Sequence, residues 1–294
     1  MRIRRQITSA GPQISIVEIE TAQGWTALAG DELAWLTELP PPSPVAGFVL
    51  PFQPRSFRDV LLYQDHWINS SRGYVRRFMP SAFRVTSAYE RLTGTTFPAF
   101  RPPQLFHTQP VYYFGNHLTI VPSGVPVAIP SFTQALDYEL ELGFVLAKPL
   151  RNATAQEAIE AIGGFVVIND FSARDIQRAE MRSGFGPQKS KHFLSSMSAT
   201  LVTPEDILPR IEALEAAIEI NGRRIASLSS AGMRFSLGEV LAYLSKDEHL
   251  HPGELIATGT LPGGSGLETR RLLAKGDELR LIIDGVGEIT HTIQ

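Results

Sequence analysis

The sequence DYELELGFVLAKPL, residues 137–150, decides the fold together with the apolar run GFVVIND at residues 164–170. Successive side chains of a β-strand point to opposite faces, so Glu139 and Glu141 share one face. The apolar run is typical of a strand buried on both sides, and it ends in Asp170. Alternating charges are also common on the wet face of an antiparallel strand. The first motif alone therefore leaves a carboxylate site and a solvated strand open.

Three carboxylates meet if the two strands are neighbours. At low dielectric they would repel one another unless a cation lies between them, and hard divalent cations prefer oxygen ligands. We therefore predict a Mg²⁺ or Mn²⁺ site at Glu139, Glu141 and Asp170. Ser172 is predicted to cap a following helix that places Arg174 and Gln177 on one face, close to this site.

Composition excludes several classes of protein. The chain has 294 residues, 43% hydrophobic and 19% charged, which is typical of a globular protein with a full core. A net charge of −3 without a dense basic run argues against nucleic-acid binding. The absence of cysteine excludes thiolate catalysis, zinc-thiolate sites and disulfides. No apolar run is long enough for a membrane span and no signal peptide is recognised, so we expect a cytoplasmic protein.

The chain divides into two parts by pattern. Residues 1–50 are predicted to form a small N-terminal β domain, with a hairpin after residues 14–20 and a proline-rich linker at 40–44. Residues 51–294 are predicted to form the main domain. Its many short alternating strands, with a hairpin at Asn221-Gly222, favour a β-rich α+β fold, closed or rolled, over a parallel βαβ sheet.

Local capping signals predict three helices. Ser56 is predicted to cap a helix running to Ile68, on which Asp59 and His66 would share a face roughly 10 Å apart. Thr154-x-x-Glu157 and Ser236-x-x-Glu239 predict two more, the first ending at Gly163-Gly164. Arg76, further along the first segment, is interpreted either as a solvated charge or as a clamp for an acidic ligand.

The combined pattern resembles the fumarylacetoacetate hydrolase family, from about residue 57 to the C-terminus. The residues that carry the resemblance are DYELEL at 137–142, INDFSARDIQ at 168–177, Lys191 before Phe193, and Thr258-Gly259-Thr260 leading to Glu268. The resemblance implies a mixed β-roll that binds Mg²⁺, Mn²⁺ or Ca²⁺ through Glu139, Glu141 and Asp170.

The spacing of Asp59 and His66 is similar to the fumarylacetoacetase branch, where a metal-binding aspartate precedes the catalytic histidine by seven residues. Leu61 and Val75 depart from that branch, which has a tyrosine and an arginine there. The resemblance implies that the catalytic residues are His66, Glu268, Lys191, Arg174 and Gln177, and that Tyr113, Thr260 and Arg76 bind substrate.

The implied activity is metal-dependent hydrolysis of a carbon–carbon bond in a small 1,3-diketo acid. His66, paired with Glu268, would activate water, while Lys191 with Arg174 or Gln177 holds the developing oxyanion. Two alternatives stay open. One is decarboxylation, isomerisation or tautomerisation of a 2-oxo acid on the same fold, and the other is a metal-binding protein without turnover. By the same resemblance we expect a homodimer.

Overall fold

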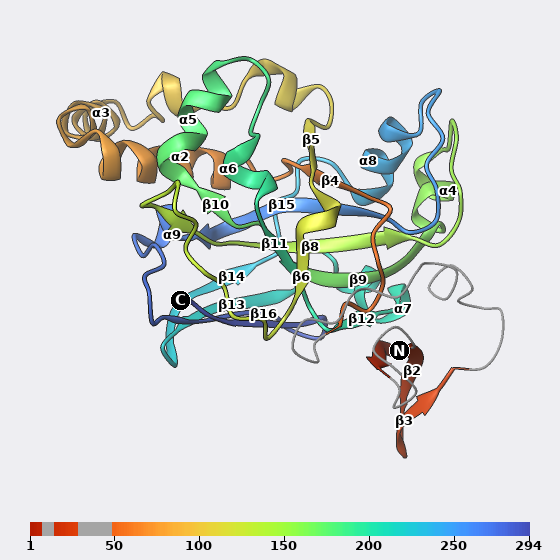
Figure 1. Ribbon diagram of the computed structural model, residues 1–294. Coiled ribbons are helices and arrows are strands. Elements are labelled where there is room, and N and C mark those ends of the chain that lie inside the picture. Colours follow the sequence, from red (N-terminus) through yellow and green to blue (C-terminus); the bar gives the residue numbers. More distant parts are fainter. Residues whose placement is uncertain (8–14, 29–48) are drawn as a thin grey trace.

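The structure is a computed structural model that describes residues 1–7, 15–28 and 49–294. In these ranges it has a mixed 11-stranded sheet and an antiparallel four-stranded sheet, with most of the apolar core between them. In the view of Figure 1, helices α2, α3, α5 and α6 lie above the large sheet and the small sheet lies below it. The predicted β-rich α+β fold is confirmed.

The large sheet follows the spatial order β3-β2-β1-β12-β9-β8-β15-β4-β5, and β11 joins β9 and β6 to it. Its strands are β1 (Arg2–Ile7), β2 (Ser15–Thr21), β3 (Gly24–Ala27), β4 (Ser56–Val60), β5 (Tyr112–Gly115), β6 (Ile120–Pro122), β8 (Glu139–Leu146), β9 (Ile162–Asn169), β11 (Ser195–Met197), β12 (Thr200–Val202) and β15 (Glu254–Ser265).

The small sheet has the order β14-β13-β16-β17, and β7 and β10 form a separate pair. These strands are β7 (Leu136–Asp137), β10 (Ser172–Ala173), β13 (Glu215–Ile220), β14 (Arg223–Ser229), β16 (Glu278–Ile283) and β17 (Gly287–Thr292). The α-helices are α2 (Gln64–Phe78), α3 (Pro80–Thr93), α4 (Ala155–Ile159), α5 (Arg174–Arg182), α6 (Lys189–His192), α7 (Pro204–Ile207), α8 (Leu237–Leu244) and α9 (Gly266–Thr269). Short 3₁₀ turns are η2 (Pro98–Phe100), η3 (Gln104–His107), η4 (His117–Thr119) and η5 (Leu208–Arg210).

Strands β8 and β9 form the centre of the large sheet and are antiparallel, with Glu141 opposite Ile168. Every residue of β8 is buried. The side chains that alternate with its glutamates belong to the core cluster facing the small sheet: Tyr138, Leu140, Leu142 and Phe144. The glutamates therefore stand on a rigid strand that is covered on both faces.

Residues 56–68 correct the predicted helix. Ser56–Val60 is strand β4, which pairs parallel with β15, and the helix begins only at Gln64. Asp59 lies on the strand and His66 in the first turn of the helix, so the two do not share a helical face. Apolar residues three apart fit a helix face, but they also fit a fully buried strand.

Two further expectations were wrong in detail. Ser172 lies in β10 opposite Asp137, and the residue that precedes helix α5 is Ala173, without a side-chain cap. The glycines at 163–164 lie inside β9, where a Cβ on Gly164 would come within 2.3 Å of Leu201, so they permit close packing rather than end a helix.

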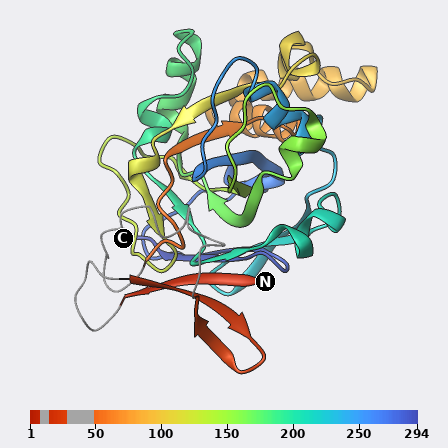
Figure 2. The same cartoon turned by 90° about the vertical axis from the view of Figure 1, so that its right-hand side faces the viewer.

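The capping boxes that begin α4 and α8 are confirmed, as is the Asn221-Gly222 hairpin, whose two turn residues have φ of 54° and 72°. Figure 2 places β1 beside the rest of the molecule, with the β2–β3 hairpin projecting from it. β1 pairs with β12 of the large sheet. The predicted linker at 40–44 lies outside the described residues, and the division at residue 50 stays a prediction. In the described ranges, no helix is long and apolar enough to cross a membrane.

Candidate metal and catalytic centre

Three buried carboxylates converge where the central strands end. Asp59 comes from β4, Glu141 from β8, and Asp170 directly follows β9. Each offers one oxygen, and the three oxygens all lie within 4.8 Å of one another. The three side chains are at most 6% exposed. They come from separate parts of the chain, and the strand order of the large sheet brings them together.

The electrostatics of this trio fit a divalent cation. Burial raises the pKa of Asp59, and the nearby charge of Asp170 raises it further. Burial and the charges of Asp59 and Asp170 also raise the pKa of Glu141. The buried Oε2 atom of Glu141 has no hydrogen-bond partner among the described residues. The three carboxylates repel one another, and an oxygen of Glu141 still has a lone pair to donate. Hard divalent cations bind such a set of oxygen ligands.

Glu139, the fourth predicted metal ligand, lies beside the trio but contacts cations of the protein. Arg174 Nη2 donates to its Oε1 atom at 2.5 Å, and Lys191 Nζ donates to its Oε2 atom. Burial alone would raise the pKa of Glu139, but Arg174, Lys191 and His66 outweigh it and lower that pKa. Glu139 is thus held ionised, and its role as a metal ligand stays a prediction.

Lys191 joins Glu139 to the trio. Its Nζ atom also donates to Asp170 Oδ2 at 2.5 Å, and these two carboxylates raise the lysine pKa despite the opposing effect of burial. The hydroxyl of Tyr113 donates to the same Asp170 oxygen at 2.5 Å. Thr260 Oγ1 donates to Glu141 Oε1 at 3.2 Å. The structure therefore brings Lys191, Tyr113 and Thr260 to the carboxylates.

His66 faces this cluster with one nitrogen and Glu268 with the other. Its Nδ1 atom is 2.8 Å from Glu268 Oε2, and its Nε2 atom is 3.5 Å from Glu139 Oε1. Glu268 is itself held by the amide of Gly263 and the hydroxyl of Ser265, each at 2.9 Å. With the proton on Nδ1, the Nε2 atom is free to accept a proton at the cluster.

Helices α2 and α9, which carry His66 and Glu268, touch through their backbones. A Cβ on Gly73 of α2 would lie 2.2 Å from the carbonyl oxygen of Leu267 in α9. The contact between α2 and α9, which positions the histidine–glutamate pair, therefore leaves no room for a side chain at Gly73.

The remaining predicted residues lie at different distances from the cluster. Gln177 accepts a hydrogen bond from Arg174 Nη1 at 3.0 Å, so it supports the arginine. The guanidinium of Arg76 lies 4.7 Å from the ring centre of Phe83, and its part in substrate binding stays a prediction.

Sequence reasoning missed Ser195 and the contacts of Asp137. Ser195 Oγ donates to Asp170 Oδ1 at 3.3 Å, and no pattern in the sequence signalled it. Asp137, which opens the first motif, accepts from Arg174 Nε at 2.7 Å. The available signal was the spacing, because an aspartate two residues before Glu139 lies on the same face of an extended strand.

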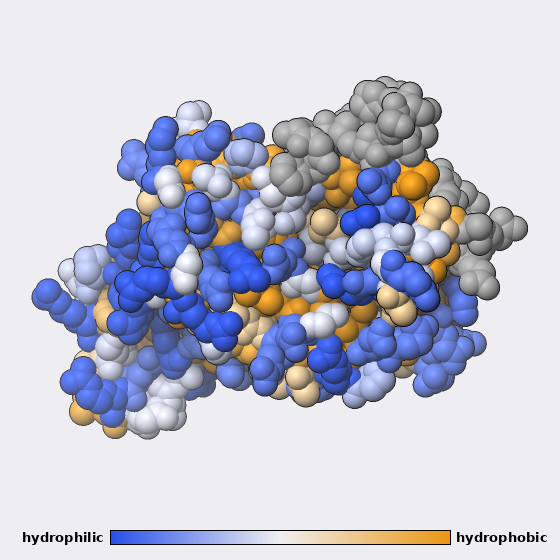
Figure 3. All heavy atoms as spheres, turned by 90° about the horizontal axis from the view of Figure 1, so that it is seen from below, coloured by the Kyte–Doolittle hydropathy of each residue, from blue (hydrophilic) through white to orange (hydrophobic). Residues whose placement is uncertain are grey.

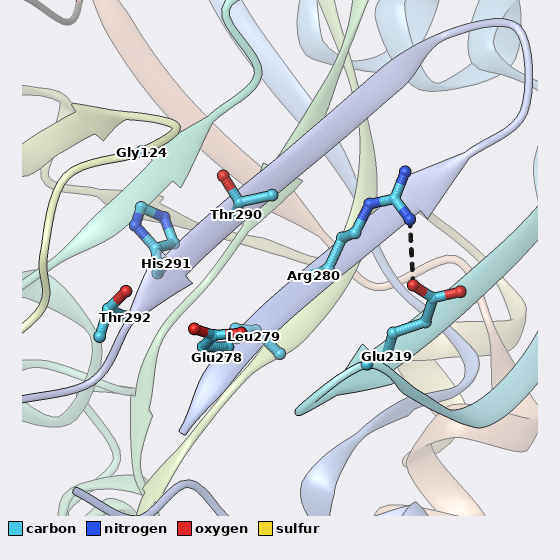
Figure 4. Close-up of a pocket in the computed structure, with 9 residues that line it drawn as sticks. Gly124, Glu219, Glu278, Leu279, Arg280, Thr290, His291 and Thr292 are labelled. Atoms are coloured by element: carbon cyan, nitrogen blue, oxygen red, sulfur yellow. Dashed lines mark hydrogen bonds and ion pairs between the residues drawn. The ribbon is translucent and has the colours of Figure 1, made fainter. Parts of the chain in front are cut away.

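A surface pocket on the small sheet is separate from this centre. Figure 4 shows Glu219 and Arg280 at its edge, joined by an ion pair of 3.0 Å, with Thr290 nearby. Arg280 also pairs with Glu288 at 2.6 Å, so its charge is already balanced. From below, in Figure 3, the visible surface is largely hydrophilic around apolar patches. None of the predicted site residues lines the pocket of Figure 4.

Comparison with known proteins gives one family match, two similar sequences and one similar structure. Residues 81–294 match the family Fumarylacetoacetate (FAA) hydrolase C-terminal. The chain is 28% identical over 187 residues to the mitochondrial oxaloacetate tautomerase FAHD1 of Homo sapiens, covering 64% of this chain and 82% of that protein. It is 33% identical over 192 residues to the oxaloacetate tautomerase YisK of Bacillus subtilis, covering 65% of this chain and 61% of that protein. Its fold is similar to fumarylpyruvate hydrolase from Pseudomonas aeruginosa in complex with Mn²⁺ and pyruvate, with a TM-score of 0.61 and 21% identity over 85% of this chain and 92% of that one.

Proposed function

Because the chain belongs to the fumarylacetoacetate hydrolase family, we propose that it is a metal-dependent enzyme that tautomerises a 2-oxo acid such as oxaloacetate. The proposal is supported by the two oxaloacetate tautomerases among its relatives. The observation that carries it is the His66–Glu268 pair facing the buried carboxylates. Carbon–carbon hydrolysis, which the sequence favoured, becomes the second candidate.

Asp59, Glu141 and Asp170 would hold the cation, with Glu139 beside them. Mg²⁺ and Mn²⁺ suit this all-oxygen donor set, and Mn²⁺ is present in the fumarylpyruvate hydrolase of similar fold. When bound, the cation supplies Lewis acidity toward the carbonyl and carboxylate oxygens of a 2-oxo acid.

His66 would carry the proton in either direction. In the keto-to-enol direction the C3–H bond breaks and its proton goes to Nε2 of His66. The released electron pair forms the C2–C3 double bond, and the carbonyl oxygen takes up one proton from solvent. The protonated His66 then releases its proton to solvent, so that atoms and charge balance over the cycle and the base is restored. Glu268 fixes the imidazole in the orientation this transfer needs and stabilises its protonated form.

The ion pairs of Lys191 and Arg174 favour tautomerisation over hydrolysis. Both reactions develop negative charge on the carbonyl oxygen that the metal ion would hold, but hydrolysis also requires a free donor for the oxyanion that forms when water attacks the distal carbonyl. Lys191 is committed to Glu139 and Asp170, and Arg174 to Asp137 and Glu139. A single base is sufficient for tautomerisation.

The second candidate is supported by a specific observation. Glu268 is anchored by Gly263 and Ser265 in the arrangement expected of a carboxylate that orients a histidine for water activation. The same pair could then deliver hydroxide to the distal carbonyl of a diketo acid. Binding of substrate between Lys191 and its carboxylates would have to release the lysine first.

Product analysis tests the proposal. Metal-stripped protein is assayed with and without Mg²⁺ or Mn²⁺ against oxaloacetate, acetylpyruvate and fumarylpyruvate, with products identified by NMR. We expect metal-dependent approach to the keto–enol equilibrium of oxaloacetate without loss of carbon. Two fragments from a diketo acid, or CO₂ and pyruvate from oxaloacetate, at rates above that of tautomerisation would overturn it in favour of the hydrolase or the decarboxylase.

A pair of variants assigns the base. His66→Asn should lower kcat by about 100-fold or more, because general acid–base groups contribute this order of magnitude. His249→Asn, at an exposed histidine, is the matched control and should leave kcat unchanged. We also propose the homodimer implied by the family, which light scattering of the purified protein tests.

A further inference from the structure

We infer that Asp137 is a positioning residue that holds Arg174 and the Glu268-bearing helix α9 in one fixed arrangement around the cluster, an inference that rests on the proposed function. Asp137 is fully buried and belongs to the short strand β7, just before β8. It neither touches His66 nor belongs to the carboxylate trio. Its contacts reach both halves of the site.

One oxygen of Asp137 holds the start of helix α9. Oδ1 accepts from the amide of Gly266 at 2.7 Å and from the amide of Tyr138 at 2.8 Å. Gly266 opens α9, and Glu268 follows two residues later. This oxygen therefore ties the helix that orients His66 to the strand pair that leads into β8.

The other oxygen holds the arginine that contacts Glu139. Oδ2 accepts from Arg174 Nε at 2.7 Å and from the amide of Leu267 at 3.2 Å. Arg174 donates from Nη2 to Glu139 at 2.5 Å and from Nη1 to Gln177 at 3.0 Å. One carboxylate thus receives four N–H donors, one from the arginine, two from α9 and one from the next residue of the chain.

The contact with α9 is as close as the backbone permits. A Cβ on Gly266 would lie 2.3 Å from Asp137 Oδ1, so only glycine allows this approach. The missing side chain of Gly266 and the hydrogen bond from its amide therefore both keep Asp137 close to the start of α9. Because all four donors are N–H groups, an amide in place of the carboxylate would turn its NH₂ group toward two of them and lose both bonds.

The test is Asp137→Asn, which keeps the size of the side chain. We expect kcat to fall by about 10- to 100-fold, as is typical when a group that orients catalytic residues is removed. We expect the dissociation constant for Mn²⁺, measured by calorimetry, to change by less than about threefold, because Asp137 does not contact the carboxylate trio. A metal affinity that fell as much as kcat would overturn the inference.

A readout that does not depend on turnover separates this inference from the proposed reaction. The Nδ1–H proton of His66 in its hydrogen bond to Glu268 and the Nε–H of Arg174 are observed by NMR in the metal-free protein. Both signals should shift or broaden in Asp137→Asn. If both signals stayed unchanged, Asp137 would have no positioning role, whatever the enzyme catalyses.

Asp277 provides a matched control. It is also buried, and it accepts from an arginine, Arg271, at 2.6 Å and from a backbone amide, that of Ala274, at 2.8 Å. Asp277→Asn should lower thermal stability but keep both NMR signals and kcat. Equal effects of the two aspartate variants would overturn the inference.

If Asp137→Asn does not fold, Gly266→Ala tests the same contact while keeping the carboxylate. The alanine methyl should displace α9 and change the His66 signal more than the Arg174 signal. An unchanged His66 signal in this variant would overturn the inference. If the wild-type protein turned over no 2-oxo acid while the NMR changes appeared, the proposed reaction would fail and the positioning role would stand.

Discussion

Replacement of Gly73 by alanine should separate the two helices that hold His66 and Glu268. The new Cβ would lie 2.2 Å from the carbonyl oxygen of Leu267, and the facing atom is backbone that cannot rotate away. Non-bonded atoms are comfortable at about 3.5 Å, so the helices must move apart by about 1 Å. Inside a helix, alanine would otherwise be favoured over glycine by roughly 1 kcal/mol.

The magnitude follows from these two effects. Overpacking a tight contact lowers the free energy of unfolding by about 1–3 kcal/mol, and the better helix propensity of alanine offsets roughly 1 kcal/mol of this. The net loss of stability is therefore at most about 2 kcal/mol. A displacement of about 1 Å between a base and its partner can lower the rate by about 100-fold. Activity should therefore suffer much more than stability.

The assay combines steady-state kinetics with thermal unfolding. We expect Gly73→Ala to lower kcat by one to two orders of magnitude while the melting temperature falls by only a few degrees. Ser71→Ala on the same helix is the control and should keep kcat. If Gly73→Ala retained wild-type kcat, the α2–α9 contact would not set the His66–Glu268 geometry, and the reasoning would be refuted.

Three further predictions concern single groups. Glu141→Gln should weaken Mn²⁺ binding by about 10-fold or more, measured by calorimetry, and should raise the stability of the metal-free protein because one repelling charge is gone. Glu268→Gln should lower kcat by about 10- to 100-fold while the metal affinity, measured in parallel, is kept. Burial lowers the pKa of His291 below its ordinary value of 6.5, so the unfolded state gains a proton at this histidine at a higher pH than the folded state does. Urea unfolding between about pH 7.5 and 5.5 should therefore show a loss of stability that His291→Gln reduces and His249→Gln at an exposed site does not.

Local pattern was sufficient for the strands that carry the glutamates. The alternation in residues 137–142 and the apolar run before Asp170 specify buried strands, because side-chain period and hydrophobicity agree. The Asn221-Gly222 turn was equally readable, since both residues tolerate positive φ. The strands and the turn could be predicted because residues close in the sequence determine them.

Residues 56–68 could not be predicted in the same way. The apolar spacing there fits a helix, and only the parallel pairing of β4 with residues 254–257 of β15 makes it a strand. The same limit applies to the site. The motif places Glu139 and Glu141 on one face, but it does not say that Glu139 meets Arg174 and Lys191 while Glu141 joins Asp59 and Asp170.

The parallel pairing of β4 with β15 also sets the order in which the protein can mature during synthesis. Ser56 and Glu254, hydrogen-bonded across these strands, are 198 positions apart. A ribosome must therefore finish most of the chain before Asp59 has the neighbouring strand that places it beside Glu141. Asp59, Glu141 and Asp170 can converge only once the residues of β15 have been made, and contacts of such long range form slowly. The candidate metal site therefore assembles late, after the long segment that separates β4 from β15 has been synthesised.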